Sequence, residues 1–331
     1  MTVLVTGACG RIGRHVVRQL LERGIEVSGS DIGASAARLG DLAGRVEVEA
    51  ADVRDLAALV QSFRRRRVSR VVHLAARFGQ DSDRHPRSSM EVNLGGTLSV
   101  LEAAQLCGVE RVVMASSHSL YPPAAGVHGP PEWGAIGESH PADPARPYTI
   151  MKLACEQLGR FFARRCGVEF AAVRFSSFYG AERAVQRGSS LSDALNRMII
   201  DALEGIPVRF ERGGEQVFDP VYIKDCAHGV VCALLADREL DGRIYNIGGG
   251  RPVTLNEAAA AVRAALPDAD IEVGPGLGFA GVGSAAGHLP WLDIGRARRE
   301  LGYRPQYTLE QGIRDTVGEL RARSGRATPA S

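Results

Sequence analysis

The chain has 331 residues, 45% of them hydrophobic and 24% charged, and its formal net charge at pH 7 is +2. This length can bury a large core, and so small a net charge gives no reason to expect nucleic acid or an anionic membrane as a partner. No apolar run approaches the roughly 18 residues of a membrane-spanning helix, and six cysteines without metal-type spacing predict reduced thiols and no bound metal. A strand pattern directly after Met1 argues against a targeting segment, so we expect a cytoplasmic location.

The first half of the chain alternates short β-branched runs with amphipathic helical patterns. Several of the runs are nearly continuous in apolar residues, which is typical of strands buried on both faces of a parallel sheet. The sequence therefore predicts an α/β fold, a doubly wound parallel sheet of the Rossmann type. The expected strands are 3–7, 25–31, 45–52, 70–76, 111–117 and 169–175.

The alternation loosens after residue 175, where helical patterns, short strand-like runs and a glycine-rich stretch follow one another. We expect residues 1–175 to form the Rossmann domain and residues 176–325 to form mainly a smaller substrate-binding lobe. Residues 217–250 are expected to return to the first domain, and residues 326–331 to be a disordered tail. The ligand is expected in the cleft between the two parts.

A glycine-rich turn, TGACGRIG, places Gly7, Gly10 and Gly13 between the first expected strand and the first expected helix. Glycines there let the backbone approach a pyrophosphate, and the helix N-terminus supplies N–H donors. Asp31 ends the second strand, where its carboxylate can bind the adenosine ribose and repel a 2′-phosphate. No arginine follows Asp31 directly, so we expect NAD rather than NADP. Asp52 ends the third strand and could bind the adenine amino group or only cap the next helix.

Tyr148 and Lys152 lie four residues apart on an expected helix, and therefore on one face of it. The Lys152 ammonium and the positive nicotinamide of the oxidised cofactor would lower the pKa of Tyr148, so that the tyrosinate could remove a carbinol proton as hydride leaves. Lys152 could also hold the nicotinamide ribose. Ser117 ends the fifth strand at the edge where open α/β sheets bind ligands, and can hydrogen-bond the same substrate oxygen.

Together these motifs resemble the extended short-chain dehydrogenase/reductases, the NAD-dependent epimerase/dehydratase family, through nearly the whole chain. The resemblance rests on TGACGRIG, Asp31, ADV at 51–53, HLAA at 73–76, Asn93 in NLGGT, SSHSLY, Tyr148 with Lys152, VRFSSFYG, YNIGGG and DIGRARRELGYRP. It implies a homodimer with a four-helix interface and a catalytic set of Ser117, Tyr148 and Lys152. Asn93 is expected to support the site, although a helix-interior asparagine can be only a local kink. The expected NAD contacts are Gly7, Gly10, Arg11, Ile12, Gly13, Asp31, Asp52, Val53, Leu74, Ala75, Ala76, Asn93, Tyr148 and Lys152.

One departure from the family pattern concerns the reaction. Members that remove water from a sugar ring usually carry an acidic pair directly after the catalytic serine or threonine, and this chain has His118 and Ser119 there. Without an acid for the leaving hydroxyl and a carboxylate for the C–H proton, a 4,6-dehydratase mechanism is not expected. His118 could carry a proton, hydrogen-bond the substrate, or simply be a loop histidine that faces water.

A second departure from the family pattern concerns the residues that bind the diphosphate group of the substrate. Nucleotide-sugar epimerases usually bind the diphosphate with two arginines and an asparagine, where this chain has Phe218, the cation-free stretch 281–293 and Ser177. A diphosphate requires bidentate cations and backbone donors, so their absence argues against a UDP-sugar. The arginines that could replace them are Arg183, Arg187, Arg209 and Arg212.

We therefore expect an NAD-dependent epimerase or dehydrogenase that transfers hydride at a secondary alcohol of a sugar or a sugar-like substrate, such as a polyol or sugar acid. Net epimerisation and net dehydrogenation both stay open. The alternatives are a nucleotide-sugar epimerase with a non-standard phosphate anchor and a non-catalytic, dinucleotide-sensing regulatory protein. The expected substrate contacts are Arg77, Ser117, His118, Tyr121, Ser177 and Arg183.

Overall fold

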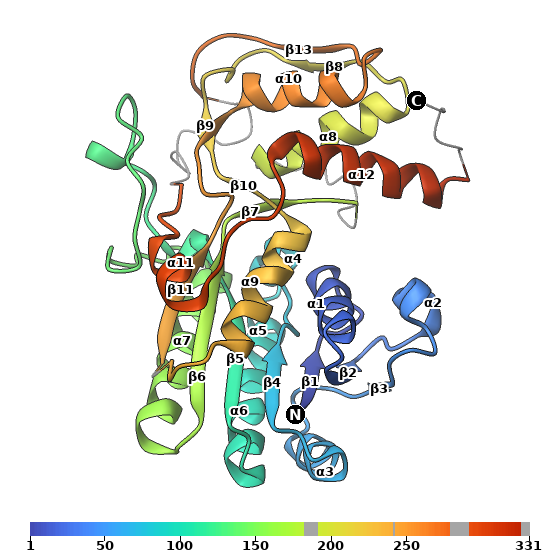
Figure 1. The fold of residues 1–331 in the computed structure, drawn as a ribbon. Coiled ribbons are helices and arrows are strands. Elements are labelled where there is room, and N and C mark those ends of the chain that lie inside the picture. Colours follow the sequence, from blue (N-terminus) through green and yellow to red (C-terminus); the bar gives the residue numbers. More distant parts are fainter. Residues whose placement is uncertain (182–190, 241, 279–290, 326–331) are drawn as a thin grey trace.

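The computed structural model describes residues 1–181, 191–240, 242–278 and 291–325. Its centre is a seven-stranded parallel sheet with the order β11-β6-β5-β4-β1-β2-β3 (Figure 1). The order reverses between β1 and β4, as in the doubly wound fold that the sequence predicts, and this prediction is confirmed. The strands are β1 (Thr2–Thr6), β2 (Glu26–Asp31), β3 (Val48–Ala50), β4 (Arg70–His73), β5 (Arg111–Ser117), β6 (Glu169–Phe175) and β11 (Arg243–Ile247).

The sheet separates two apolar layers because each strand places alternate residues on opposite faces. Val3 and Val5 of β1 join one layer and Leu4 joins the other, and all three are fully buried. The helices over the first layer are α1 (Arg11–Glu22), α9 (Ile223–Leu235) and α11 (Gly295–Leu301). The helices over the second are α3 (Leu56–Arg66), α6 (Gly96–Cys107) and α7 (Pro147–Arg165).

A smaller lobe lies beyond the carboxyl ends of the strands (Figure 1). It has its own core, to which Met198, Val262 and Ile313 contribute fully buried side chains. Its elements are α8 (Leu191–Leu203), α10 (Leu255–Ala265), α12 (Leu309–Arg323) and the strand pairs β7 (Ser177–Tyr179) with β10 (Pro220–Tyr222), β8 (Val208–Phe210) with β13 (Ile271–Val273), and β9 (Val217–Phe218) with β12 (Val253–Thr254). The lobe thus faces the edge at which open α/β sheets bind ligands.

The chain returns from the smaller lobe to the sheet through α9 and β11, and α9 packs on α1 while β11 pairs with β6. Short helices complete the connections. These are α2 (Ala36–Leu39), η1 (Gly40–Leu42), α4 (Gly79–Arg84), α5 (Pro86–Met90), the π-helical turn η2 (Glu91–Gly95), η3 (His118–Leu120) and η4 (Gly126–His128).

A buried arginine holds the end of α9 against the sheet. Arg111, at the start of β5, is 3% exposed, and its guanidinium donates to the carbonyl oxygens of Leu234 (3.0 Å), Ala236 (2.8 Å) and Arg238 (2.8 Å). It also pairs with the Glu169 carboxylate at 2.7 Å. Carbonyls at a helix end have no partner within the helix, so Arg111 caps α9 while it fixes the start of β5.

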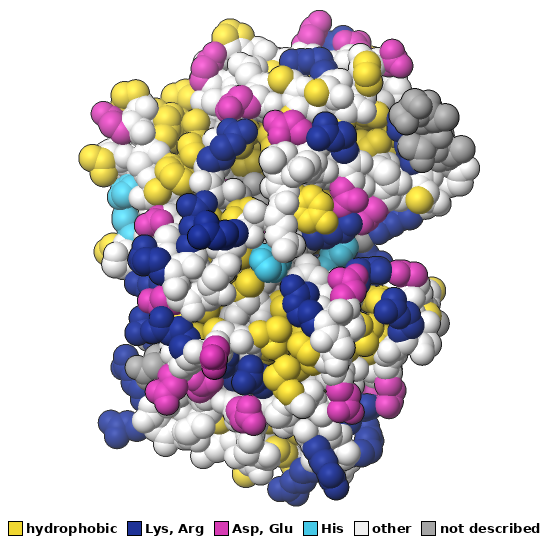
Figure 2. Space-filling model, in the orientation of Figure 1, with side chains coloured by type: hydrophobic (Ala, Val, Ile, Leu, Met, Phe, Trp, Pro, Cys, Tyr) yellow, Lys and Arg dark blue, Asp and Glu magenta, His cyan; other side chains and the backbone are white. Residues whose placement is uncertain are grey.

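The surface carries both signs of charge. Figure 2 shows Lys and Arg side chains interspersed with Asp and Glu over the viewed face. Within the described ranges, the structure has no helix both long and apolar enough to span a bilayer.

Candidate active site

The turn between β1 and α1 has no space for side chains at its three predicted glycines. Gly7 has a φ of +70°, and a Cβ added there would lie 2.8 Å from the backbone nitrogen of Ala75. A Cβ at Gly10 or Gly13 would lie 2.9 Å or 2.1 Å from the carbonyl oxygen of Gly7. Helix α1 follows without a side-chain cap or an acidic residue in its first turn, so its N–H groups suit a pyrophosphate. The residues present therefore fit the predicted dinucleotide.

Asp31 ends β2 beside this turn, with a side chain only 10% exposed. One carboxylate oxygen accepts from the backbone N–H of Cys9 at 3.1 Å, and the other from that of Gly33 at 2.9 Å. Nη1 of Arg38 lies 3.9 Å from the Asp31 carboxylate. Arg38 belongs to α2 and stands seven residues after Asp31, so a search for an arginine directly after Asp31 does not find it.

Asp52 follows β3 and pairs with Arg54. Oδ2 of Asp52 lies 2.6 Å from Nη2 of Arg54, and this hydrogen-bonded guanidinium lowers the pKa of Asp52. The alternative role of Asp52 as the cap of the next helix is wrong, because Asp55 caps α3 by accepting from the backbone N–H of Ala58 at 3.0 Å.

Three other predicted cofactor contacts are Arg11 and Ile12 at the start of α1, and Val53 in the loop between β3 and α3. The guanidinium carbon of Arg11, in the first turn of α1, lies 5.1 Å from the ring centre of Phe78. Ile12 packs against the cores of both lobes. Val53 is 6% exposed, and a Cβ added at Gly96 of α6 would lie 2.6 Å from it. Close packing therefore fixes Val53 against α6.

The predicted segment 74–76 follows β4 directly, beside the glycine turn. It is preceded by His73, whose Nδ1 lies 2.7 Å from the Thr6 hydroxyl and whose Nε2 lies 3.1 Å from the Thr97 hydroxyl. Burial lowers the pKa of His73 to about 3. The imidazole is therefore neutral and links β1, β4 and α6 by hydrogen bonds.

Asn93 lies in the π-helical turn and holds the backbone of Arg77. Its side-chain oxygen accepts from the Arg77 N–H and its amide group donates to the Arg77 carbonyl, both at 2.8 Å. The Arg77 guanidinium donates to Asp81 (2.8 Å) and to Ser88 (3.1 Å). Asn93 therefore lies at a local distortion of the helix, and its side chain also fixes the backbone of Arg77.

The three predicted catalytic residues come from β5 and α7, which pack against each other. Ser117 is the last residue of β5, and its hydroxyl lies 2.6 Å from that of Ser119. Nζ of Lys152 donates to the carbonyl oxygen of Ala115 at 2.8 Å and lies 5.9 Å from the ring centre of Tyr148. Lys152 therefore links the helix that carries Tyr148 to the strand end that carries Ser117.

The pKa of Tyr148 depends on burial and on the charges around its hydroxyl group. In the protein alone, burial raises the pKa of Tyr148 above its ordinary value, and burial lowers the pKa of Lys152. The expected lowering of the Tyr148 pKa concerns a site that also holds the oxidised cofactor, so it stays a prediction. The remaining favourable charge in that prediction is the positive nicotinamide, which only the cofactor supplies.

A buried ion pair that the sequence analysis missed lies behind the strand end. Glu156, one turn after Lys152, accepts from the Ser116 hydroxyl at 2.6 Å and pairs with Arg174 of β6 at 2.7 Å. The side chains of Glu156 and Arg174 are 0% and 5% exposed. The sequence does contain a signal for this pair, namely an arginine within the run FAAVRF at 170–175, where every other residue is apolar, and a glutamate four residues after Lys152 on the helix.

Tyr121 and Asn246 connect this edge to later segments of the chain. Tyr121, which the sequence places among the substrate contacts, is 5% exposed, and its hydroxyl donates to the Asn246 side chain at 2.9 Å. The Asn246 amide donates to the carbonyls of Ile136 (3.0 Å) and Asp293 (3.3 Å). Asn246 thus joins β11 to two separate loop segments.

His118 is buried, so the alternative of a loop histidine facing water is wrong. Its side chain is 8% exposed, and Nδ1 lies 2.9 Å from the carbonyl oxygen of Phe175. Since a carbonyl only accepts, Nδ1 carries the proton. Burial lowers the pKa of His118, so the imidazole is neutral and Nε2 can only accept a hydrogen bond.

The predicted substrate residues of the smaller lobe are dispersed. Ser177 lies in β7 and is 7% exposed. Arg209 pairs with Asp270 at 2.6 Å, and Arg212 donates to the carbonyl of Leu277 at 3.2 Å. Arg183 and Arg187 lie outside the described residues.

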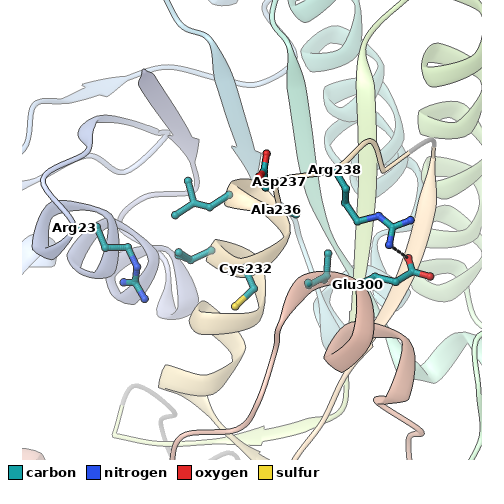
Figure 3. Close-up of a pocket in the computed structure, with 9 residues that line it drawn as sticks. Arg23, Cys232, Ala236, Asp237, Arg238 and Glu300 are labelled. Carbon is teal, nitrogen blue, oxygen red and sulfur yellow. Dashed lines mark ion pairs between the residues drawn. The ribbon is translucent and has the colours of Figure 1, made fainter.

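A hollow of about 400 Å³ lies far from these residues (Figure 3). It is lined by Arg23 at the end of α1, Cys232 of α9, and Glu300 of α11, and Nη1 of Arg238 lies 4.0 Å from the Glu300 carboxylate. These residues lie toward the amino ends of the strands, whereas Ser117 lies at a carboxyl end. The hollow therefore does not belong to the candidate site.

Comparison with known proteins agrees with this arrangement. Residues 3–248 match the model of the NAD dependent epimerase/dehydratase family. The UDP-glucose 4-epimerase of Mycolicibacterium smegmatis is 29% identical, with 98% of this chain and 100% of that protein covered. The UDP-glucose 4-epimerase of Thermus thermophilus, in complex with NAD, has a TM-score of 0.78 at 30% identity, with 97% and 99% covered. The dTDP-glucose 4,6-dehydratase of Streptomyces venezuelae, solved with NAD, has a TM-score of 0.79 at 28% identity, with 99% of each chain covered.

Proposed function

Because the chain belongs to the NAD-dependent epimerase/dehydratase family, we propose that it transfers hydride at a secondary alcohol carbon of a sugar or sugar-like small molecule. It is an NAD-dependent enzyme of the extended short-chain dehydrogenase/reductase type. The observation that carries the finer proposal is the hydrogen bond from Lys152 to Ala115. This contact supports the assignment of Tyr148, Lys152 and Ser117 to one catalytic set.

The glycine turn, Asp31 and Lys152 are the proposed anchors of NAD. The turn would hold the pyrophosphate, Asp31 the adenosine ribose and Lys152 the nicotinamide ribose. When bound, NAD supplies an acceptor and donor of hydride and, in its oxidised form, a positive charge. The other proposed contacts are Arg11, Ile12, Asp52, Val53, Leu74, Ala75, Ala76, Asn93 and Tyr148.

Tyr148 is the proposed acid/base and Ser117 the residue that hydrogen-bonds the same substrate oxygen. Tyr148 takes the carbinol proton as the C–H hydride departs, and returns a proton in the reverse direction. His118 and Ser119 provide no carboxyl group for the removal of water, which supports redox chemistry at the carbinol rather than 4,6-dehydration. Net epimerisation and net dehydrogenation are both compatible with this set.

Two classes of substrate are candidates, and they differ in whether the substrate carries a nucleoside diphosphate. Phe218, which precedes Asp219, is fully buried, and both Asp219 carboxylate oxygens accept from backbone N–H groups, of Gly249 (2.8 Å) and Leu292 (3.1 Å). The absence of a cation at Phe218 favours a sugar, polyol or sugar acid without a diphosphate. The near full-length likeness to enzymes named for UDP- and dTDP-sugars favours the second candidate, a nucleotide-sugar epimerase with another anchor. The proposed substrate contacts are Arg77, Ser117, His118, Tyr121, Ser177 and Arg183.

One experiment separates the outcomes. Purified enzyme is incubated with UDP-sugars and with free sugars, sugar acids and polyols, while reduced nicotinamide is followed by absorbance and product stereochemistry by NMR. Stoichiometric reduced cofactor identifies a dehydrogenase, and an inverted stereocentre without net reduction identifies an epimerase. Unchanged activity in Tyr148→Phe would contradict the catalytic assignment and favour a dinucleotide-sensing role.

We propose that residues 1–175 and 217–250 bind the cofactor, and that the rest of 176–325 mainly binds the substrate. The pairing of β11 with β6 and the packing of α9 on α1 support this division. The predicted tail, residues 326–331, lies outside the described residues.

We also propose a homodimer formed through α6 and α7. Ile150 and Phe161, about three turns apart on one face of α7, are 52% and 55% exposed, and Leu106 at the end of α6 is 58% exposed. Burial of such side chains stabilises association. Sedimentation should show a dimer that Phe161→Glu dissociates, while Ile206→Glu, at a residue 47% exposed in the smaller lobe, leaves it intact.

A cytoplasmic location is part of the same proposal. All six cysteines are free thiols, and unpaired buried thiols are typical of proteins from reducing compartments. Fractionation of cells that produce the tagged protein tests the location.

A further inference from the structure

The first turn of α7 receives a carboxylate from a distant segment of the chain. Its own residues, 147–150, include no acid, and Pro147 has no N–H, so Tyr148 carries the first N–H of the helix. Amides in the first turn of a helix find no acceptor within it. Asp83, in the short helix α4, supplies one, because its Oδ1 accepts from the Tyr148 N–H at 3.3 Å. A negative charge at this end also suits the dipole of α7.

Arg146 holds the other oxygen of the same carboxylate. Oδ2 of Asp83 accepts from Nε of Arg146 at 2.8 Å and from Nη2 of the same guanidinium. Arg146 directly precedes α7, and its own backbone N–H donates to the Thr149 hydroxyl at 3.2 Å. The Asp83 carboxylate, 22% exposed, therefore joins the residue before the helix to the first amide within it. It cannot rotate without breaking one of these contacts.

Residues 77–84, which contain Asp83, also contact the proposed cofactor site. The ring centre of Phe78, directly before α4, lies 5.1 Å from the guanidinium carbon of Arg11 in the first turn of α1. Helix α4 in turn packs against α7. The segment therefore connects the start of α1 to the start of α7, and Asp83 provides its hydrogen bonds to the latter.

We propose that Asp83 is a positioning residue for Tyr148, and that its carboxylate holds the first turn of α7 so that the phenol stays in the proposed reaction site. Lys152, one turn later, has a separate anchor in the carbonyl oxygen of Ala115, so loss of the Asp83 contact should displace Tyr148 more than Lys152. A displacement of about 1 Å at a reacting group can cost on the order of 10²-fold in rate. This inference rests on the acid/base role proposed above for Tyr148.

Amide exchange at Tyr148 tests the contact without any substrate. The chain has seven tyrosines, so isotopic labelling of the tyrosine nitrogens gives a small set of backbone signals by NMR, and Tyr148→Phe identifies the Tyr148 signal by its loss. Asp83→Ala should speed hydrogen exchange at this amide by about tenfold or more, the equivalent of one hydrogen bond to a charged acceptor. The other tyrosine amides report on the fold as a whole and should keep their rates.

Two matched comparisons separate this contact from a general loss of charge. Asp81→Ala removes a carboxylate from the same short helix, one that pairs with Arg77 and is 56% exposed, and should leave the Tyr148 amide unchanged. In an Arg146→Met background, Asp83→Asn keeps an oxygen for the Tyr148 N–H and should retain slow exchange, whereas Asp83→Ala should not. This pair also decides the matter if Asp83→Ala alone accelerates every tyrosine amide.

Turnover tests the consequence for the reaction. The probe is whichever UDP-sugar, free sugar, sugar acid or polyol of the panel described above the wild type converts fastest. Asp83→Ala should lower kcat about tenfold or more and change KM by less than about threefold, since Asp83 acts through Tyr148 and not on the substrate. In the Arg146→Met background, Asp83→Asn should turn over faster than Asp83→Ala.

Two results would overturn the inference. One is unchanged exchange at the Tyr148 amide in folded Asp83→Ala, and the other is a wild-type kcat in that variant although the exchange has accelerated. A failure of the proposed function gives a different result. If Tyr148→Phe keeps wild-type turnover, the acid/base role of Tyr148 is wrong and the positioning role falls with it. If Tyr148→Phe loses turnover and Asp83→Ala does not, only the positioning role is wrong.

Discussion

The Lys152 ammonium donates a hydrogen bond to the carbonyl oxygen of Ala115, 2.8 Å away, two residues before Ser117. The contact fixes a cation against the strand end, in a side chain only 5% exposed. An uncharged residue at position 152 would therefore change the electrostatics of the site as well as its geometry.

Lys152→Met should reduce the rate of carbinol oxidation at neutral pH by about 10²- to 10⁴-fold. Tyr148 acts as a base only above its pKa, and burial raises that pKa. The rate should therefore rise with pH, and loss of the ammonium should move this rise to higher pH. The measurement is kcat/KM against pH, with Tyr148→Phe as the control that should lose the rise altogether. An unshifted profile in Lys152→Met would contradict the electrostatic role.

Glu156→Gln should destabilise the protein by about 3–5 kcal/mol, because it leaves the buried charge of Arg174 without its partner. Glu156→Leu combined with Arg174→Met should cost less than Glu156→Gln alone, since it removes both charges. Urea denaturation monitored by circular dichroism measures each free energy of unfolding.

The surface pair of Arg18 and Asp41 provides the control for Glu156. Two hydrogen bonds of 2.6 Å join these side chains, but Asp41 is 63% exposed. Asp41→Asn should therefore cost no more than about 1 kcal/mol. Equal costs for Asp41→Asn and Glu156→Gln would contradict the argument from burial.

Arg111→Met should destabilise the protein by about 3 kcal/mol or more. The substitution removes the hydrogen-bond donor to the carbonyls at the end of α9 and leaves the Glu169 carboxylate without its ion-pair partner. Arg111→Lys keeps the positive charge, but an ammonium group lacks the planar set of N–H donors with which the guanidinium reaches several carbonyls. It should therefore recover only part of the loss. Thermal unfolding and hydrogen exchange in α9 measure both effects, and full recovery by lysine would rule out the capping role.

Because of Asp219, the free energy of unfolding should fall as pH rises from about 4 to about 6. Burial raises its pKa from 3.8 to about 6 in the folded chain, so between these values the folded state holds a proton that the unfolded state has lost. The difference in unfolding free energy between wild type and Asp219→Asn, measured across this range, isolates the effect. The wild type should lose about 2–3 kcal/mol relative to the variant as pH rises; a flat difference would contradict the shift.

The sheet could be predicted from sequence because β1, β5 and β6 are buried on both faces and are therefore mostly apolar. Patterns of this kind located β1, β5 and β6 well. The expected strand at 45–52 was too long, since only 48–50 pair with β2. The last strand, β11, was expected only as part of a returning segment, because its pairing with β6 spans about 70 residues of chain.

The candidate site was predictable where one short motif carries it, as with the glycine turn, and less so where distant residues meet. Arg38 lies 3.9 Å from Asp31 although seven positions separate the two residues in the sequence. The pairing of Glu156 with Arg174 joins a helix to a strand and leaves no local spacing signal. The burial of His118 depends on β6, which supplies the Phe175 carbonyl, and nothing near His118 in the sequence indicates it.

The position of β11 has a consequence for synthesis on the ribosome. The strand that completes the sheet comes from residues 243–247, after α8 and much of the smaller lobe. A nascent chain that has emerged only through β6 exposes an unpaired strand edge and lacks α9 over α1. Such edges are prone to pairing with other chains. The seven-stranded sheet therefore cannot be completed before residues 243–247 have been synthesised. Until then the growing chain passes through a stage in which it needs protection from aggregation.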